Sequence, residues 1–183
     1  MTEEEVLLSV LARLEKLRIP HMLTGSFASN YYGQPRSTGD ADVVVHVESK
    51  HVPSLLRAFK KDFYISKTAV EEAIRLGRSF NVIHFKSAFK VDIVVRQDRP
   101  FSKEELSRRR HVTLWGQRVW IASAEDVILS KLEWAKLGGS EQKFRDALEV
   151  YRVQRGALDM TYLKRWAREL LIYELLEQVT AAS

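Results

Sequence analysis

Two aspartates stand one residue apart at the start of a run of valines. Asp40 and Asp42 lie in the segment "GDADVVV", and a third acid, Asp92, lies in "KVDIVV". Residues two apart in a strand share a face, so Asp40 and Asp42 point one way while Ala41 and Val43 point towards the core. Burying an unpaired carboxylate is costly. If the two strands are neighbours, the three carboxylates converge on one face of a sheet.

Three converging carboxylates favour a bound cation. Like charges held close together raise one another's pKa, and a divalent ion removes this conflict. Ligand sets made only of oxygen atoms suit Mg²⁺. We therefore predict that Asp40, Asp42 and Asp92 bind metal. The alternative for so short a motif is a polar strand face open to water.

A second feature, Gly25-Ser26, lies between a predicted strand at 21–24 and a predicted helix that ends near Tyr32. Glycine lets the backbone approach an anion closely. The N–H groups and the dipole at the start of a helix favour phosphate, and Ser26 can add a hydroxyl. The pair therefore predicts a phosphate-binding turn, with an ordinary turn and helix N-cap as the alternative.

The elements that must position these residues follow from hydrophobic periodicity. Helices are predicted at 3–18, 50–61, 70–76 and 102–109, the last capped by Ser102. Strands are predicted at 21–24, 41–47, 79–85 and 89–95, and a hairpin of 111–115 and 118–122 turns at Gly116-Gln117. From Ser123, a capping residue, the pattern is helical, with breaks at Gly138-Gly139 and near Gly156. We predict an α/β fold, with a short mixed sheet and helices in residues 1–122 and a helical bundle in residues 123–183 that completes the active site.

Composition narrows the class of protein. The chain has 183 residues, 45% of them hydrophobic, which is enough for a core in one domain or one domain with an appendage. It has no cysteine, which excludes disulfides and thiolate metal sites. The acidic start "MTEEEVLLSV" and the lack of an apolar run of about 18 residues predict a cytoplasmic protein without membrane association. The net charge of +5 favours anionic partners such as nucleotides or RNA.

Two charged residues of the helical part are further candidates. Lys131 projects from the middle of an apolar helix face, where its amine either extends to solvent or meets an anion. Asp146 lies in "EQKFRDALEVY", where helical spacing places it away from the core side, and the alternative to a functional role is a solvated helix charge. The predicted apolar residues of the two helices are Ala124, Val127, Ile128, Leu132, Trp134 and Ala135, followed by Phe144, Ala147, Leu148 and Tyr151.

The combined pattern resembles a known family. "GS", thirteen further residues and "DAD", with Arg36 and Thr38 just ahead, is similar to the signature of the DNA polymerase β-like nucleotidyltransferase superfamily. "KVDIV" resembles the strand that carries the third acid of that superfamily. The resemblance covers roughly residues 23–95. The small size is similar to the minimal nucleotidyltransferases and to the nucleotidyltransferase toxins of type IV toxin–antitoxin systems.

The resemblance implies a reaction and a set of roles. The chain is expected to be an enzyme of the nucleotidyltransferase class that moves NMP from an NTP, such as ATP, to an acceptor hydroxyl and releases pyrophosphate. Asp40 and Asp42 would bind two Mg²⁺ ions, and Asp92 would bind the ion that activates the acceptor or act as its base. The residues expected to hold the nucleotide are Gly25, Ser26, Arg36, Thr38 and Lys131.

The helical part carries two further resemblances. "SAEDVILSKLEWA" is similar to a segment of the toxin-like enzymes whose lysine approaches the nucleotide phosphates, which supports Lys131. "EQKFRDALEVY" is similar to the Lys-Asp-x-x-Asp segment, with Arg145-Asp146 in place of Lys-Asp and Glu149 in place of the second Asp. This likeness implies a catalytic role for Asp146.

The resemblance also suggests partners. The acceptor would be the 3′ end of an RNA such as tRNA, and a cognate antitoxin protein would bind the chain. Basic residues at Arg108–Arg110, with Arg152, Arg155, Lys164, Arg165 and Arg168, could form an RNA-facing surface or the solvated faces of helices. The alternatives are a non-catalytic binding module that keeps the fold as a scaffold, and an enzyme that modifies a small molecule such as an antibiotic.

Overall fold

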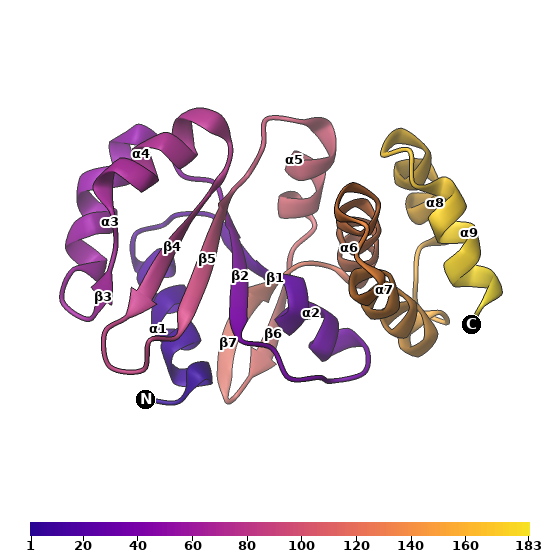
Figure 1. Cartoon of the computed structure of the whole chain (residues 1–183), viewed down its shortest axis with the longest axis horizontal. Helices are drawn as coiled ribbons and strands as arrows, with labels where there is room; N and C mark the ends of the chain where they lie inside the picture. The colour runs from indigo at the N-terminus through magenta and orange to yellow at the C-terminus, as the bar shows by residue number, and fades with distance from the viewer. The chain divides into compact units, whose positions relative to one another are not determined.

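The computed structural model describes residues 1–183 and divides into two compact units (Figure 1). Unit 1 consists of Met1–Thr24 and Thr38–Ile121. Unit 2 consists of Gly25–Ser37 and Ala122–Ser183. The helical part therefore also includes the segment 25–37, which the sequence pattern had grouped with the α/β part.

Unit 1 contains one seven-stranded mixed sheet, which confirms the predicted fold class. Its strand order is β3-β4-β5-β2-β1-β7-β6. The pairs β2–β5 and β1–β7 are parallel, and the other neighbours are antiparallel. The strands are β1 (His21–Thr24), β2 (Asp40–Val45), β3 (Phe63–Tyr64), β4 (Ser79–His84), β5 (Lys90–Val95), β6 (Arg110–Leu114) and β7 (Gln117–Ile121).

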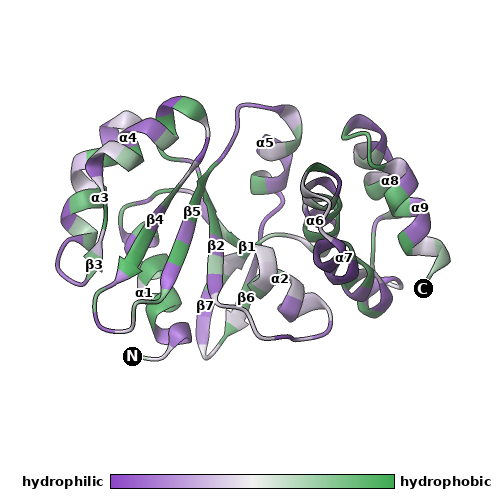
Figure 2. Cartoon of the chain, in the orientation of Figure 1, coloured by the Kyte–Doolittle hydropathy of each residue, from purple (hydrophilic) through white to green (hydrophobic).

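The core of unit 1 takes alternate residues of these strands. Ala41, Val43 and Val45 of β2 are buried, as are Val91 and Ile93 of β5. Figure 2 shows these strands mainly in the hydrophobic colour, with hydrophilic bands on β2 and β5. The helices of the unit are α1 (Glu3–Lys16), the short 3₁₀ helix η1 (Ser49–His51), α3 (Val52–Phe59), α4 (Lys67–Leu76) and α5 (Pro100–Ser107). Helix α1 packs on β1 and α3, and α4 packs on β4.

Three local details of unit 1 differ from the sequence predictions. Helix α5 begins at Pro100 because proline is preorganised for a first helical position, so Ser102 lies inside the helix and is not its cap. The β6–β7 hairpin turns at Trp115 and Gly116, with φ values of 48° and 76°. Two positive φ values are typical of a tight two-residue hairpin, so the predicted turn was one residue late. Strand β3, with only two residues, was missed because it is too short to show periodicity.

Unit 2 is all helical. Helix α6 packs on α7 and α8, α2 packs on α6 and α7, and α9 packs on α7 and α8. Its helices are α2 (Gly25–Tyr32), α6 (Ala124–Gly138), α7 (Glu141–Gln154), α8 (Met160–Glu169) and α9 (Tyr173–Ala181). Ser123 caps α6 as predicted, because its hydroxyl accepts a hydrogen bond from the Asp126 N–H. None of the helices in either unit has the length and apolar character needed to cross a membrane.

A close approach between α2 and α7 yields a first prediction. A Cβ at Gly33 would lie 2.9 Å from the Val150 N atom and 3.1 Å from the Glu149 C atom, both backbone atoms that cannot move independently. Gly33→Ala is therefore expected to lower the free energy of unfolding by about 1–3 kcal/mol, the usual cost of overpacking. Urea denaturation measures this change. In the control Gly138→Ala, the new Cβ meets no atom within 4 Å, and a loss of stability equal to that of Gly33→Ala would contradict the steric explanation.

Candidate active site

The acidic strands of unit 1 are neighbours, and their register brings two aspartates together. β2 and β5 pair in parallel, with Asp42 opposite Asp92 and Asp40 opposite Lys90. In-register residues of adjacent parallel strands share a sheet face, and residues two apart in one strand do so as well. Asp40, Asp42, Lys90 and Asp92 therefore lie on one face, opposite the valine-rich core face.

A lysine lies among these carboxylates. The Lys90 ammonium is 2.9 Å from Oδ2 of Asp92 and 3.8 Å from Oδ2 of Asp40. The hydrogen bond to Asp92, together with the charges of Asp92, Asp40 and Asp42, raises the pKa of Lys90 above its usual value despite some burial. The acidic face thus carries its own positive charge.

Neighbouring polar side chains orient two of the aspartates. The Asn81 amide, on the adjacent strand β4, donates to Oδ1 of Asp92. The Thr38 hydroxyl donates to the backbone O of Asp40 at 3.1 Å and lies 3.4 Å from Oδ1 of Asp40. Thr38, predicted to bind the nucleotide, is therefore placed beside the first aspartate.

The donor chemistry of this face fits Mg²⁺. It offers carboxylate oxygens from Asp40, Asp42 and Asp92, the ligand type that Mg²⁺ prefers. The side chains share a face, but no group of three acidic, histidine or cysteine side chains in the chain converges closely enough to form a closed metal site. Binding of an ion would require these side chains to turn inwards and Lys90 to move aside.

The predicted phosphate-binding turn opens helix α2 of unit 2. Gly25 has φ 61°, a left-handed conformation that glycine adopts without strain. Ser26 follows within the first turn of α2, and its hydroxyl accepts a hydrogen bond from Nη2 of Arg36 at 3.0 Å. The turn and Arg36, both expected to hold the nucleotide, are therefore directly connected.

The backbone of Arg36 is held by Asn30 of α2. The Asn30 amide donates to the Arg36 carbonyl at 2.7 Å, and its side-chain oxygen accepts from the Arg36 N–H at 3.1 Å. This pair of bonds fixes the segment that follows α2. The guanidinium of Arg36 is thereby directed to its partners on α7.

The carboxylate of Asp146 is the centre of a charged network in unit 2. Nε and Nη2 of Arg36 each donate to it at 2.9 Å, and Nζ of Lys131 donates at 2.6 Å. Gln142, one turn earlier on α7, adds a fourth bond at 2.9 Å. Arg36 and Lys131 belong to different segments, and Asp146 joins them.

Asp146 is buried, which excludes the alternative of a solvated helix charge and corrects the placement of this residue away from the core side. Its side chain is only 5% exposed, and the buried residues of α7 are Asp146, Ala147 and Val150. Helical spacing misplaced Asp146 because α7 packs on α2 and α6, and the segments of these helices supply the cations that neutralise the acid. Burial alone would raise the pKa of Asp146, but the hydrogen bonds from Arg36, Lys131 and Gln142 outweigh it and hold the pKa well below its usual range.

The sequence left open whether the Lys131 amine extends to solvent or meets an anion, and the structure shows the second arrangement. Its ammonium does not extend to solvent but meets an anion, Asp146, and its side chain is only 8% exposed. The apolar face of α6 around it is buried as predicted, except at Trp134. Trp134 is 53% exposed, and the Lys143 ammonium lies 5.1 Å from the centroid of its ring.

The sequence analysis missed four residues that contact the predicted site residues. Lys90 could have been found from its place two residues before Asp92, and Gln142 from its place one helical turn before Asp146. Asn81 and Asn30 carry no such signal in the sequence. Asn81 reaches Asp92 only through the pairing of β4 with β5, and Asn30 bonds to the backbone of Arg36 in the irregular segment after α2.

Several basic residues considered for RNA binding have local partners. The Arg109 guanidinium lies 4.4 Å from the ring centroid of Trp120, whose other partner is the stacked ring of His111. Arg152 bonds to Glu149 at 2.8 Å, and Arg165 lies 3.7 Å from Glu169. Arg155, Lys164 and Arg168 are exposed on unit 2.

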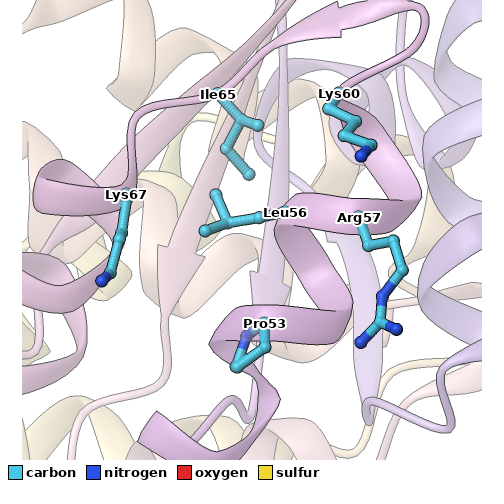
Figure 3. Close-up of a pocket in the computed structure, with 6 residues that line it drawn as sticks. All are labelled: Pro53, Leu56, Arg57, Lys60, Ile65 and Lys67. Carbon is cyan, nitrogen blue, oxygen red and sulfur yellow. The ribbon is translucent and has the colours of Figure 1, made fainter.

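One pocket of unit 1 is not lined by any predicted site residue. It lies in unit 1 between α3 and the start of α4, with a volume of about 490 Å³, and is lined by Pro53, Leu56, Arg57, Lys60, Ile65 and Lys67. Figure 3 shows Leu56 and Ile65 pointing towards each other. It offers no carboxylate for a metal ion, so the acidic face of β2 and β5 is the better candidate.

Comparisons of the sequence and of the structure with known proteins show which proteins share this fold. No model of a known protein family matches this chain, and no curated protein is significantly similar to it in sequence. An antigenic nucleotidyltransferase-like protein from Paracoccidioides brasiliensis shares its fold with a TM-score of 0.60 at 20% identity, over 99% of this chain and 93% of that protein.

Two further solved structures have the same fold. The antibiotic-resistance factor ANT(2″)-Ia, in complex with adenylyl-2″-tobramycin, aligns with a TM-score of 0.60 at 13% identity, over 92% of this chain and 98% of its own. The lincosamide antibiotic adenylyltransferase LnuA, lincomycin-bound, aligns with a TM-score of 0.54 at 11% identity, over 84% and 98%. At these identities the likeness establishes a nucleotidyltransferase fold, and membership of the toxin-type subclass stays a prediction.

Proposed function

We propose that this chain, whose fold is that of the nucleotidyltransferases, is a Mg²⁺-dependent enzyme that transfers NMP from an NTP to an acceptor hydroxyl and releases pyrophosphate. One observation carries the proposal. Asp42 and Asp92 are in register on two adjacent parallel strands, with Asp40 on the same face. Three carboxylates on one sheet face repel one another, and a bound divalent ion would relieve that repulsion.

The acidic face would hold the metal. Asp40 and Asp42 would bind two Mg²⁺ ions, and Asp92 would bind one of them or accept the proton of the attacking hydroxyl. When bound, Mg²⁺ neutralises charge on the triphosphate and on the attacking oxygen. Asn81 and Thr38 keep Asp92 and Asp40 oriented for this role.

Unit 2 would bind the triphosphate. The positive charges of Arg36 and Lys131 outnumber the single negative charge of Asp146, so the network keeps a net positive charge, with the Ser26 hydroxyl beside it. Gly25 opens the helix whose N–H groups favour phosphate. Catalysis would then consist of positioning and charge neutralisation, as is usual in phosphoryl transfer.

Asp146 would act as a positioning residue and not as a base. A carboxyl whose pKa lies far below neutrality takes up protons poorly at physiological pH. Its four hydrogen bonds instead hold the Arg36 and Lys131 side chains in one place. This role differs from the catalytic one that the family resemblance implies.

A transfer assay tests the proposal. The protein is incubated with each α-labelled NTP, Mg²⁺ and total cellular RNA or a small hydroxyl compound, and the label in the acceptor and the released pyrophosphate are measured. Equal amounts of both products, lost on chelation of the metal, would support nucleotidyl transfer. NTP binding without transfer to any acceptor would favour the non-catalytic scaffold.

The acceptor that we propose is RNA, in line with the net charge of +5 and the basic residues of both units. RNA affinity is expected to fall by about two orders of magnitude or more between about 50 and about 200 mM salt, because bound phosphates release counterions. Fluorescence anisotropy with a labelled tRNA measures this slope. Binding that ignores salt, or none at the lower salt, would contradict the RNA acceptor but not the reaction.

Two alternatives stay open to the same assays. ANT(2″)-Ia and LnuA carry antibiotics in their structures, which favours a small-molecule acceptor as the second candidate. Label appearing in tobramycin or lincomycin and not in RNA would support it. An antitoxin partner is expected only if the chain is a toxin-type enzyme that acts on RNA.

A further inference from the structure

Lys90 is a cationic side chain within the acidic face of β2 and β5. It belongs to β5, two residues before Asp92 and in register with Asp40, so its side chain stands between the two acids. Its ammonium bonds to Asp92 at 2.9 Å and lies 3.8 Å from Asp40. The lysine thus touches two of the three groups that would bind metal.

The ammonium of Lys90 reduces the repulsion between the carboxylates of the acidic face when no metal is bound. Asp42 and Asp92 are direct neighbours in the sheet, and Asp40 lies on the same face two residues before Asp42. Carboxylates held this close repel one another unless a positive charge lies between them. An ammonium is a compact point charge with three donors, and it can lie between two carboxylates as a metal ion would.

The contacts of Lys90 also allow it to leave. Its side chain and that of Asp40 are both partly exposed, and ion pairs of this kind contribute little to stability. Asp92 does not lose its orientation when the lysine departs, because the Asn81 amide holds the other carboxylate oxygen. The flexible stem of a lysine can carry the charge to solvent or towards another anion.

We propose that Lys90 is a tethered counter-ion: it neutralises the acidic face when no metal is bound, and a divalent ion must displace it in order to bind. The inference rests on the proposed function, since it presumes that Asp40, Asp42 and Asp92 take a metal. It assigns the site a built-in competitor that lowers metal affinity and stabilises the empty state. Half-occupancy of the site would then require a higher concentration of free Mg²⁺ or of the Mg²⁺-bound nucleotide than it would without the lysine.

The test compares Lys90→Met with the wild type, using Mn²⁺ as the probe and calorimetry and electron paramagnetic resonance as readouts. Removing one positive charge near a divalent ion is expected to tighten Mn²⁺ binding by about five- to tenfold. In EDTA the variant should melt at a slightly lower temperature than the wild type: the exposed ion pair itself contributes little, but the neighbouring carboxylates repel one another once their counter-charge is removed. Saturating Mg²⁺ should remove this difference.

Two further variants keep the result interpretable. Lys86→Met removes an equal charge from the exposed β4–β5 turn and should leave Mn²⁺ affinity unchanged. Lys90→Gln removes the charge but keeps a polar side chain, and it should behave as Lys90→Met does. Equal or weaker Mn²⁺ binding by both Lys90 variants would overturn the counter-ion role while leaving the metal site intact. Failure of the wild type and of all variants to bind Mn²⁺ would overturn the metal site itself, and the role of Lys90 with it.

Discussion

Asp42→Asn is expected to abolish Mg²⁺-dependent nucleotidyl transfer. The substitution keeps the size of the side chain but removes the charge at the position in register with Asp92. A metal ion contributes several kcal/mol of transition-state stabilisation, and each 1.36 kcal/mol corresponds to a factor of ten in rate. A loss on the order of 10³-fold or more in kcat should therefore appear in the labelled-NTP assay.

The control for Asp42→Asn is Asp98→Asn. Asp98 is 85% exposed in the loop before α5 and pairs with Lys103. Its substitution removes the same charge from the same unit and should leave the rate unchanged. Circular dichroism should be the same for both variants and the wild type. Retention of most of the activity by a folded Asp42→Asn protein would show that the acidic face is not the metal site.

Asp146→Asn is expected to be among the most destabilising single substitutions in unit 2. It leaves the Lys131 ammonium, which is only 8% exposed, and the Arg36 guanidinium without their shared carboxylate. Breaking a buried ion pair from one side typically costs about 3–5 kcal/mol, because an uncompensated charge stays buried. Urea denaturation should show a loss of this size in the free energy of unfolding.

Glu141→Gln is a matched control on the same helix. Glu141 is 85% exposed and pairs with Arg145 at 2.9 Å, an arrangement that contributes little to stability. It should change the free energy of unfolding by less than about 1 kcal/mol. If Asp146→Asn were no more destabilising than Glu141→Gln, the network around Asp146 would not be the structural centre of unit 2.

The pH dependence of stability follows from the same network. The pKa of Asp146 is depressed in the folded chain, so its contribution is fully present above the unfolded-state pKa of about 3.9. As the pH falls below that value, the unfolded chain binds a proton before the folded chain does, and stability declines until the folded pKa is passed. The wild type should therefore lose more stability below pH 4 than Asp146→Asn does, and parallel curves for the two proteins would contradict this origin.

Much of the acidic face could be predicted from local sequence. The strand predicted at 41–47 is observed at Asp40–Val45, and the one predicted at 89–95 is observed at Lys90–Val95. Alternation with period two determined which residues of each strand face the core, because successive side chains of a strand point to opposite faces. The same alternation already placed Asp40 and Asp42 on one side.

The pairing of these strands was decided only by the tertiary structure. Asp42 and Asp92 are fifty residues apart in the sequence and directly opposite each other in the sheet. Periodicity within one strand does not reveal its neighbour or their register. The ammonium of Lys90 beside Asp40 is a consequence of that register, and so it could not be read from either segment alone.

Asp146 illustrates the same limit on a helix. The apolar residues of its segment predicted a core side of Phe144, Ala147, Leu148 and Tyr151, away from Asp146. Of these only Ala147 is buried, and the other buried residues of α7 are Asp146 and Val150. In the folded chain α7 packs on α2 and α6, and the cations of Arg36 and Lys131 come from the segments on either side. A carboxylate can be buried when opposite charges reach it from elsewhere in the chain. The sequence by itself thus determined most of the elements and the core faces of the strands β2 and β5, whereas the buried side of α7 and the partners that make a buried charge tolerable were decided by packing between elements distant in sequence.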